Sequence, residues 1–117
     1  MEKFSIKTLL KGEYFTTVRL TVGGLCALAD FDVDSTEDYK VCVTESLLIL
    51  KRNGFSSASI TFTLGEALAC EIVGEVLDGD KEEGLEDEIS RSLLSALLGE
   101  VAFYKEGDRI VKITFAG

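Results

Sequence analysis

The sequence contains no histidine and is poor in basic residues. Lys and Arg together number 12 against 21 Asp and Glu, which gives a formal net charge of −9. Nucleic-acid binding relies on clustered Lys and Arg that displace counterions from phosphates. Anionic membrane surfaces attract the same basic residues. We therefore expect neither nucleic acid nor a membrane as a partner.

Cysteines are few and follow no metal-binding or disulfide pattern. Cys26, Cys42 and Cys70 are odd in number, lie among apolar neighbours and form no Cys-x-x-Cys pair. A disulfide framework needs an even set, and a structural zinc site needs closely spaced Cys or His ligands. We expect three reduced, buried thiols and no metal site.

Long apolar runs are also missing. No stretch reaches the roughly 18 apolar residues that span a bilayer, and the opening MEKFSIKTLLKGEYF lacks the apolar core of a signal peptide. We therefore expect a cytoplasmic protein. The 117 residues, 46% hydrophobic and 28% charged, suit one globular domain over residues 1–117.

The apolar residues that are present recur with helical and strand periodicities. The pattern predicts helices over 13–29, 36–53 and 89–98, and strands over 4–10, 57–64, 67–73, 101–104 and 109–115. Ser35 with Asp38 predicts a capping box for the second helix, and Gly54 a left-handed residue after its end. The segment 78–88, with seven acidic residues, is predicted to be a solvated loop.

This order of elements predicts an α+β fold. We expect a two-layer sandwich with three helices on one face of a mostly antiparallel, mixed sheet.

Both ends of the sequence resemble the bacterial anti-sigma factor serine kinases, which are histidine-kinase-like (GHKL) ATPases. The resemblance lies in GEYFTTVRLTVGGL at 12–25, EDYKVCVTES at 37–46, LLSALLGEVAF at 93–103 and GDRIVKITF at 107–115. It covers nearly the whole chain except residues 74–90. The segment that would form the lid over ATP is shorter than in active members.

The family's ATP-binding residues are mostly replaced here. Its Glu-x-x-x-Asn motif, with a catalytic Glu and a Mg²⁺-ligating Asn, falls on Glu45 and Ile49, and isoleucine offers no oxygen ligand. The adenine-binding Asp corresponds to Gly74, unless a slip of four residues brings Asp78 and Gly79 there. The phosphate-binding Gly-x-Gly falls on Glu88-Ile89-Ser90, where a carboxylate opposes phosphate.

The resemblance implies a protein partner more clearly than a nucleotide. In the family, an Arg in the second turn of the first helix contacts the sigma factor or the competing anti-anti-sigma protein, and Arg19 stands at that place. We therefore expect an anti-sigma-like regulator that binds protein and lacks a working ATP site, with no cofactor. Dimers are common in the family, and an exposed sheet edge would allow a homodimer.

Two alternatives remain. The first is an active serine/threonine kinase that uses ATP and Mg²⁺ to phosphorylate an anti-anti-sigma protein, with Glu45 as its base and Asp78 at the adenine. The second is a relic of the fold whose pocket around Ile49 has become core or holds an apolar ligand.

Overall fold

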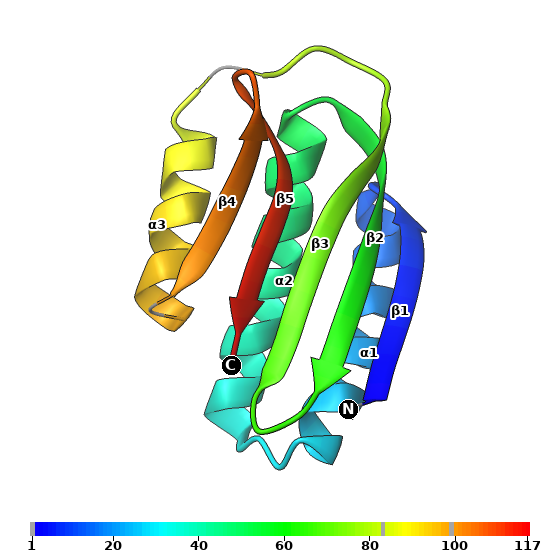
Figure 1. Ribbon diagram of the computed structural model, residues 1–117, viewed down its shortest axis with the longest axis vertical. Coiled ribbons are helices and arrows are strands. Elements are labelled where there is room, and N and C mark those ends of the chain that lie inside the picture. The colour runs from blue at the N-terminus through cyan, green and yellow to red at the C-terminus, as the bar shows by residue number, and fades with distance from the viewer. Residues whose placement is uncertain (1, 83, 99) are drawn as a thin grey trace.

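The elements follow one another in the predicted order. The computed structural model describes residues 2–82, 84–98 and 100–117. Within these ranges the elements are β1 (Glu2–Leu9), α1 (Gly12–Leu28), α2 (Val33–Arg52), β2 (Phe55–Leu64), β3 (Leu68–Leu77), α3 (Glu86–Leu98), β4 (Val101–Glu106) and β5 (Arg109–Ala116) (Figure 1).

The strands form one sheet in the order β1-β2-β3-β5-β4, and every pairing among the described strands is antiparallel. Apolar and polar residues alternate along β2. Ile60 and Phe62 are buried, whereas Thr61 and Thr63 are partly exposed. Successive side chains of a strand point to opposite faces, so one face is apolar and the other polar. The helices lie on the apolar face, behind the sheet in Figure 1, and this arrangement confirms the α+β two-layer fold.

Helix α2 is the centre of the helical layer. It packs against α1, α3 and the sheet, with α1 and α3 on opposite sides of it (Figure 1). Cys42, Val43, Leu47, Ile49 and Leu50 are all fully buried. A helix surrounded by other elements must be apolar over most of its circumference, which explains the composition of its second half.

The predicted start of α2 is wrong by three residues. Asp32, not Ser35, is the N-cap, and its Oδ1 accepts a hydrogen bond from the Ser35 backbone N–H at 2.7 Å. Asp and Ser are both favourable N-cap residues. With Asp32 as the cap, Val33 and Asp34 become part of the helix. The end of α2 is confirmed, because Gly54 has φ +97°.

Helix α3 also begins earlier than predicted, at Glu86 instead of Ile89. Glu86, Asp87 and Glu88 form its first turn, where the partial positive charge of a helix N-terminus favours carboxylates. The last part of the acidic segment is therefore helical and not a loop. In the described residues, no helix is both long and apolar enough to cross a membrane.

Candidate functional site

Helices α2 and α3 meet through polar side chains. On α2 the spacing of four, seven and eight residues after Glu45 places Ile49, Arg52 and Asn53 on one face. On α3, Asp87 and Ser90 are three residues apart and face it. We call the polar members the α2–α3 cluster: Glu45, Arg52, Asn53, Asp87 and Ser90.

Arg52 holds the cluster together. Its Nε donates to Asp87 Oδ1 at 2.7 Å and its Nη2 to Ser90 Oγ at 2.6 Å. The side chains of Arg52 and Asp87 are only 17% and 13% exposed, so water competes weakly for this charge-assisted contact. The Ser90 hydroxyl donates to Glu45 Oε2 at 2.7 Å. The carboxylate of Glu45 is thus joined to Arg52 through one buried hydroxyl.

Asn53 ties the same cluster to the sheet. Its fully buried amide donates to Ile49 O at 2.8 Å and to Asp87 Oδ2 at 3.1 Å, and its Oδ1 accepts the Ile110 N–H at 3.0 Å. Within the residues that the structure describes, every buried side-chain nitrogen and oxygen has a partner. Among the described residues, no buried polar atom of the cluster therefore lacks a hydrogen-bond partner.

Asp78 and Gly79 lie beyond the C-terminal end of α2. Their backbone N–H groups donate to Gly54 O at 2.8 and 3.0 Å, and Arg109 Nη1 donates to Gly79 O at 2.9 Å. Nine residues of chain, about 13 Å at helical rise, separate Glu45 from Gly54. These contacts do not bring Asp78 or Gly79 together with Glu45.

The position assigned to the adenine-binding Asp is covered by an aromatic ring. A Cβ at Gly74 would lie 2.5 Å from Cγ of Phe55, a ring that is itself buried. Any side chain at residue 74 would have to displace this ring. Phe55 therefore fills the space that a base-binding carboxylate would need.

The residues assigned to the phosphate loop are part of α3. The Ile89 N–H already donates to Leu85 O at 3.0 Å, and Ser90 is buried in the α2–α3 cluster. Glu88 is exposed. A phosphate-binding loop needs free, converging N–H groups, whereas from Ile89 onward these are used by the helix.

Arg19 lies apart from the cluster. It is exposed on α1, on the opposite side of α2 from α3 (Figure 1). Large apolar side chains are exposed on the same helix: Tyr14, Leu20 and Leu28 are 41%, 71% and 72% exposed. Of these residues, Leu20 is the nearest to Arg19 around the helix, whereas Leu28 lies on the opposite side of it.

Sequence reasoning selected Glu45 and Ser90 but missed Arg52, Asn53 and Asp87. The sequence analysis placed Arg52 and Asn53 at the end of the second helix and gave them no role, and it placed Asp87 in an acidic segment predicted to be a loop. Their spacing from Glu45 was the available signal. This spacing alone did not reveal the cluster, because the third helix was predicted to begin at residue 89 and so excluded Asp87.

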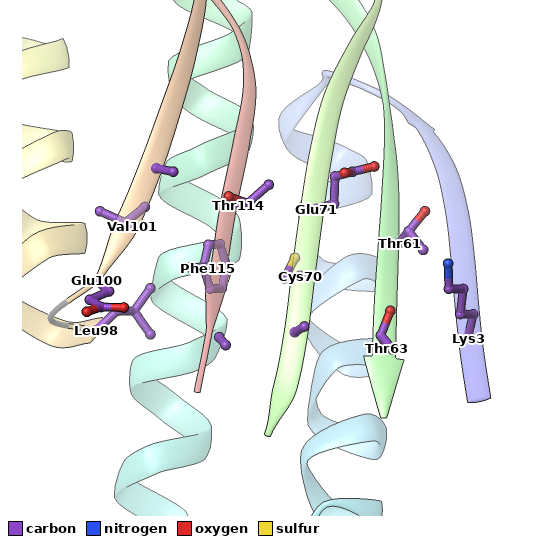
Figure 2. Close-up of a pocket in the computed structure, with 13 residues that line it drawn as sticks. Lys3, Thr61, Thr63, Cys70, Glu71, Leu98, Glu100, Val101, Thr114 and Phe115 are labelled. Atoms are coloured by element: carbon purple, nitrogen blue, oxygen red, sulfur yellow. The ribbon is translucent and has the colours of Figure 1, made fainter. Parts of the chain in front are cut away.

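A large hollow lies elsewhere, mostly on the face of the sheet opposite the helices, and it is also lined by Leu98 of α3. It is a shallow depression of about 980 Å³ (Figure 2). Lys3, Thr63, Glu71, Thr114 and Ala102 contribute to its wall from neighbouring strands. In the described part of the chain no group of three or more His, Cys, Asp or Glu residues could hold a metal ion.

No protein-family model matches this sequence, and no curated protein matches it.

Proposed function

We propose that the protein is a non-catalytic regulator of the anti-sigma type, which acts in the cytoplasm by binding another protein. The proposal joins two lines of support. One is the resemblance of both ends of the sequence to anti-sigma factor serine kinases, together with an α+β fold in the order that the resemblance implies. The other is that the residues at the positions of the family's nucleotide site are buried, covered or hydrogen-bonded to other side chains.

The α2–α3 cluster is the observation that carries the proposal. A general base must reach the proton that it removes, but Glu45 accepts a hydrogen bond from Ser90, which is itself held by Arg52. The next position, Ile49, is fully buried and has no oxygen for Mg²⁺. With Phe55 over Gly74, the residues present do not fit ATP and Mg²⁺.

Helix α1 is the proposed binding surface. The guanidinium of Arg19 can form two parallel hydrogen bonds with a carboxylate of the partner. The adjacent Leu20, 71% exposed, adds apolar area that gives binding affinity. A sigma factor or a small anti-anti-sigma protein is the partner that the resemblance implies.

A binding assay with purified proteins tests this proposal. Immobilised wild-type protein would be exposed to sigma factors and to anti-anti-sigma proteins from the same cell, beside Arg19→Glu and the control Lys105→Glu, which reverses an exposed charge on β4. We expect binding that Arg19→Glu weakens at least tenfold and Lys105→Glu leaves unchanged.

Two results would count against the proposal. If Arg19→Glu binds the partner as tightly as wild type, α1 is not the surface that binds it. Phosphate transfer from labelled ATP to an anti-anti-sigma protein, abolished by Glu45→Ala, would establish the kinase alternative instead.

A further inference from the structure

A pocket lies between the start of α2 and the end of α3, in the lower half of Figure 1, and shares no residue with the α2–α3 cluster. Its volume of about 320 Å³ is at the lower end of the roughly 300–1,000 Å³ that is typical of ligand pockets. Phe31 and Tyr39 line it in edge-to-face contact, with ring centroids 5.5 Å apart, and Leu97 and Leu98 of α3 add an aliphatic wall. The pocket therefore offers a partly buried apolar surface to a group that enters it.

The rim of this pocket is acidic. Asp30, Asp32 and Asp38 line it, and all three are exposed. Among the described residues, none of these carboxylates forms an ion pair. The described residues that line the pocket include no lysine or arginine, and the next basic residue along α2, Lys40, pairs with Glu37 at 3.2 Å. The rim thus carries three negative charges that no ion pair of the described residues neutralises.

The backbone adds to this negative potential. α1 ends at Leu28 and α3 at Leu98, both beside the pocket, and the C-terminus of a helix carries a partial negative charge. Neither helix has a basic residue in its last turn. The N-terminus of α2 has the opposite partial charge, but Asp32 caps it and Asp34 lies in its first turn. The pocket is therefore complementary to a cation that has an apolar body.

We propose that this pocket receives an arginine side chain of a partner protein. The planar guanidinium can donate to two carboxylates of the rim at once, and its flat face can stack on the ring of Phe31. Its apolar stem can pack against Leu97 and Leu98. A partner protein fits better than a small cation because Leu28 and Val33, 72% and 77% exposed, stand next to the rim residues in the sequence and offer apolar area outside the pocket. The net charge of −9 also attracts a basic partner.

This inference goes beyond the proposed function and does not rest on it. Arg19, on which the proposed function depends, lies on the opposite side of α1 from Leu28 and does not line the pocket. The pocket would recognise a basic group of a partner, whereas Arg19 would recognise an acidic one. The two surfaces can therefore be tested separately.

NMR titration of the ¹⁵N-labelled protein tests the requirement for charge. The probes are N-acetyl-arginine amide and N-acetyl-citrulline amide, which has nearly the same shape but no charge. We expect the arginine probe to shift the backbone amide signals of Phe31, Asp38 and Gly117 in a saturable manner. The citrulline probe should bind roughly tenfold more weakly, because it cannot form charge-assisted hydrogen bonds with the rim. Equal binding of the two probes, or no saturable shift of these signals, would overturn the proposal.

Asp30→Asn/Asp38→Asn removes two charges from the rim with little change of shape. Asn, like Asp, tolerates the φ of 59° at residue 30. The dissociation constant of the arginine probe should rise roughly tenfold. Asp34→Asn/Glu37→Gln is the matched control, because it removes the same charge from residues that do not line the pocket, and its affinity should stay within about twofold of wild type. Circular dichroism would establish that each variant is folded. An equal loss in both double variants, or no loss in either, would contradict binding by the rim.

The peptide acetyl-Gly-Leu-Arg-Leu-Gly-amide distinguishes a partner protein from a small cation. It should bind more tightly than the arginine probe, because its leucines reach the apolar area outside the pocket. Leu28→Ser/Val33→Ser should remove that gain and leave binding of the arginine probe unchanged. A peptide that binds no more tightly than the arginine probe would show that the pocket takes a free small cation, and it would overturn the proposal.

Discussion

Asn53 lies at the end of α2, where this helix packs against both α3 and β5. Its amide joins Ile49 O, Asp87 and the Ile110 N–H, and it is completely buried. Replacement by Ala would leave the Asp87 carboxylate and the Ile110 N–H without this partner. An unsatisfied buried polar group costs about 1–3 kcal/mol. We predict that Asn53→Ala lowers the free energy of unfolding by about 2 kcal/mol or more.

Urea unfolding would measure this loss, with Ser56→Ala as the control. The Ser56 hydroxyl makes only a long contact, 3.4 Å, to Val76 O, so its removal should change stability by less than about 0.5 kcal/mol. Equal effects of the two substitutions would show that the Asn53 amide is not part of a buried network.

The three cysteines predict a dependence of stability on alkaline pH. Burial raises the pKa of Cys42 to about 12 from its ordinary 9.0, and it also raises the pKa of Cys26 and Cys70. Above pH 9.0 the unfolded chain loses thiol protons that the native chain keeps. Stability is therefore full below the unfolded pKa and declines as pH rises toward the native pKa.

Urea midpoints measured on both sides of pH 9 would show this decline. Cys42→Ala should have a lower midpoint at neutral pH but a shallower decline, because one of the titrating thiols is gone. Thiol reagents should leave the native protein unmodified and react after unfolding. A midpoint that is constant through this range, or rapid modification of the native chain, would contradict the buried placement of the thiols.

At the scale of elements, the Arg52–Asp87 contact holds α3 on α2. Both side chains are mostly buried, so the contact should contribute more than an exposed ion pair. A double-mutant cycle with Arg52→Ala and Asp87→Ala should give a coupling energy of about 1–3 kcal/mol. The same cycle on the Lys40–Glu37 pair, in which Glu37 is 64% exposed, should give about 0.5 kcal/mol or less. Similar coupling for both pairs would contradict the role assigned to Arg52.

The N-terminus of α2 depends on Asp32. Its hydrogen bond to the Ser35 N–H lowers the pKa of the Asp32 carboxyl. We predict that Asp32→Ala destabilises the protein, because the helix loses its N-cap, whereas the neighbouring Asp34→Ala, in the first turn, has a smaller effect. The contribution of Asp32 is present above its unfolded pKa and is lost as pH falls through its native value.

Thermal unfolding at neutral and acidic pH would measure both effects. The difference between wild type and Asp32→Ala should shrink in acid. A difference that stays constant with pH would show that the carboxylate does not act as the cap.

The sequence predicted the elements better than their ends. Apolar periodicity located the helices and strands because it records which face of each element is buried. It could not choose between Asp32 and Ser35 as the cap of α2, since both side chains can accept a backbone N–H. It also placed Asp87 in a loop, because charge density outweighed the fact that carboxylates suit the first turn of a helix.

The site was harder to predict for the same reason. Glu45 and Ile49 could be compared with a known motif position by position, but the partners of Glu45 come from α3, 45 residues later in the chain. Only the folded structure brings Arg52, Asp87 and Ser90 together. The covering of Gly74 by Phe55 likewise depends on the pairing of β2 with β3, which composition does not reveal.

At the scale of the whole molecule, the fold presents three different surfaces around one core. The α2–α3 cluster lies on one side, α1 exposes Arg19 and several apolar residues, and the face of the sheet opposite the helices carries polar residues of β2 such as Thr61 and Thr63. The proposed regulator would use α1 for its partner. In this arrangement no proposed contact requires the α2–α3 cluster to open.

Titration of the protein with ATP and Mg²⁺ in a calorimeter is the most direct test of the central claim, that the nucleotide site is closed by the protein's own side chains. A known histidine-kinase-like ATPase domain would serve as the positive control. The packing of Glu45, Ile49 and Phe55 predicts no saturable heat at millimolar ATP. Saturable binding with a micromolar dissociation constant, weakened by Glu45→Ala, would contradict the claim.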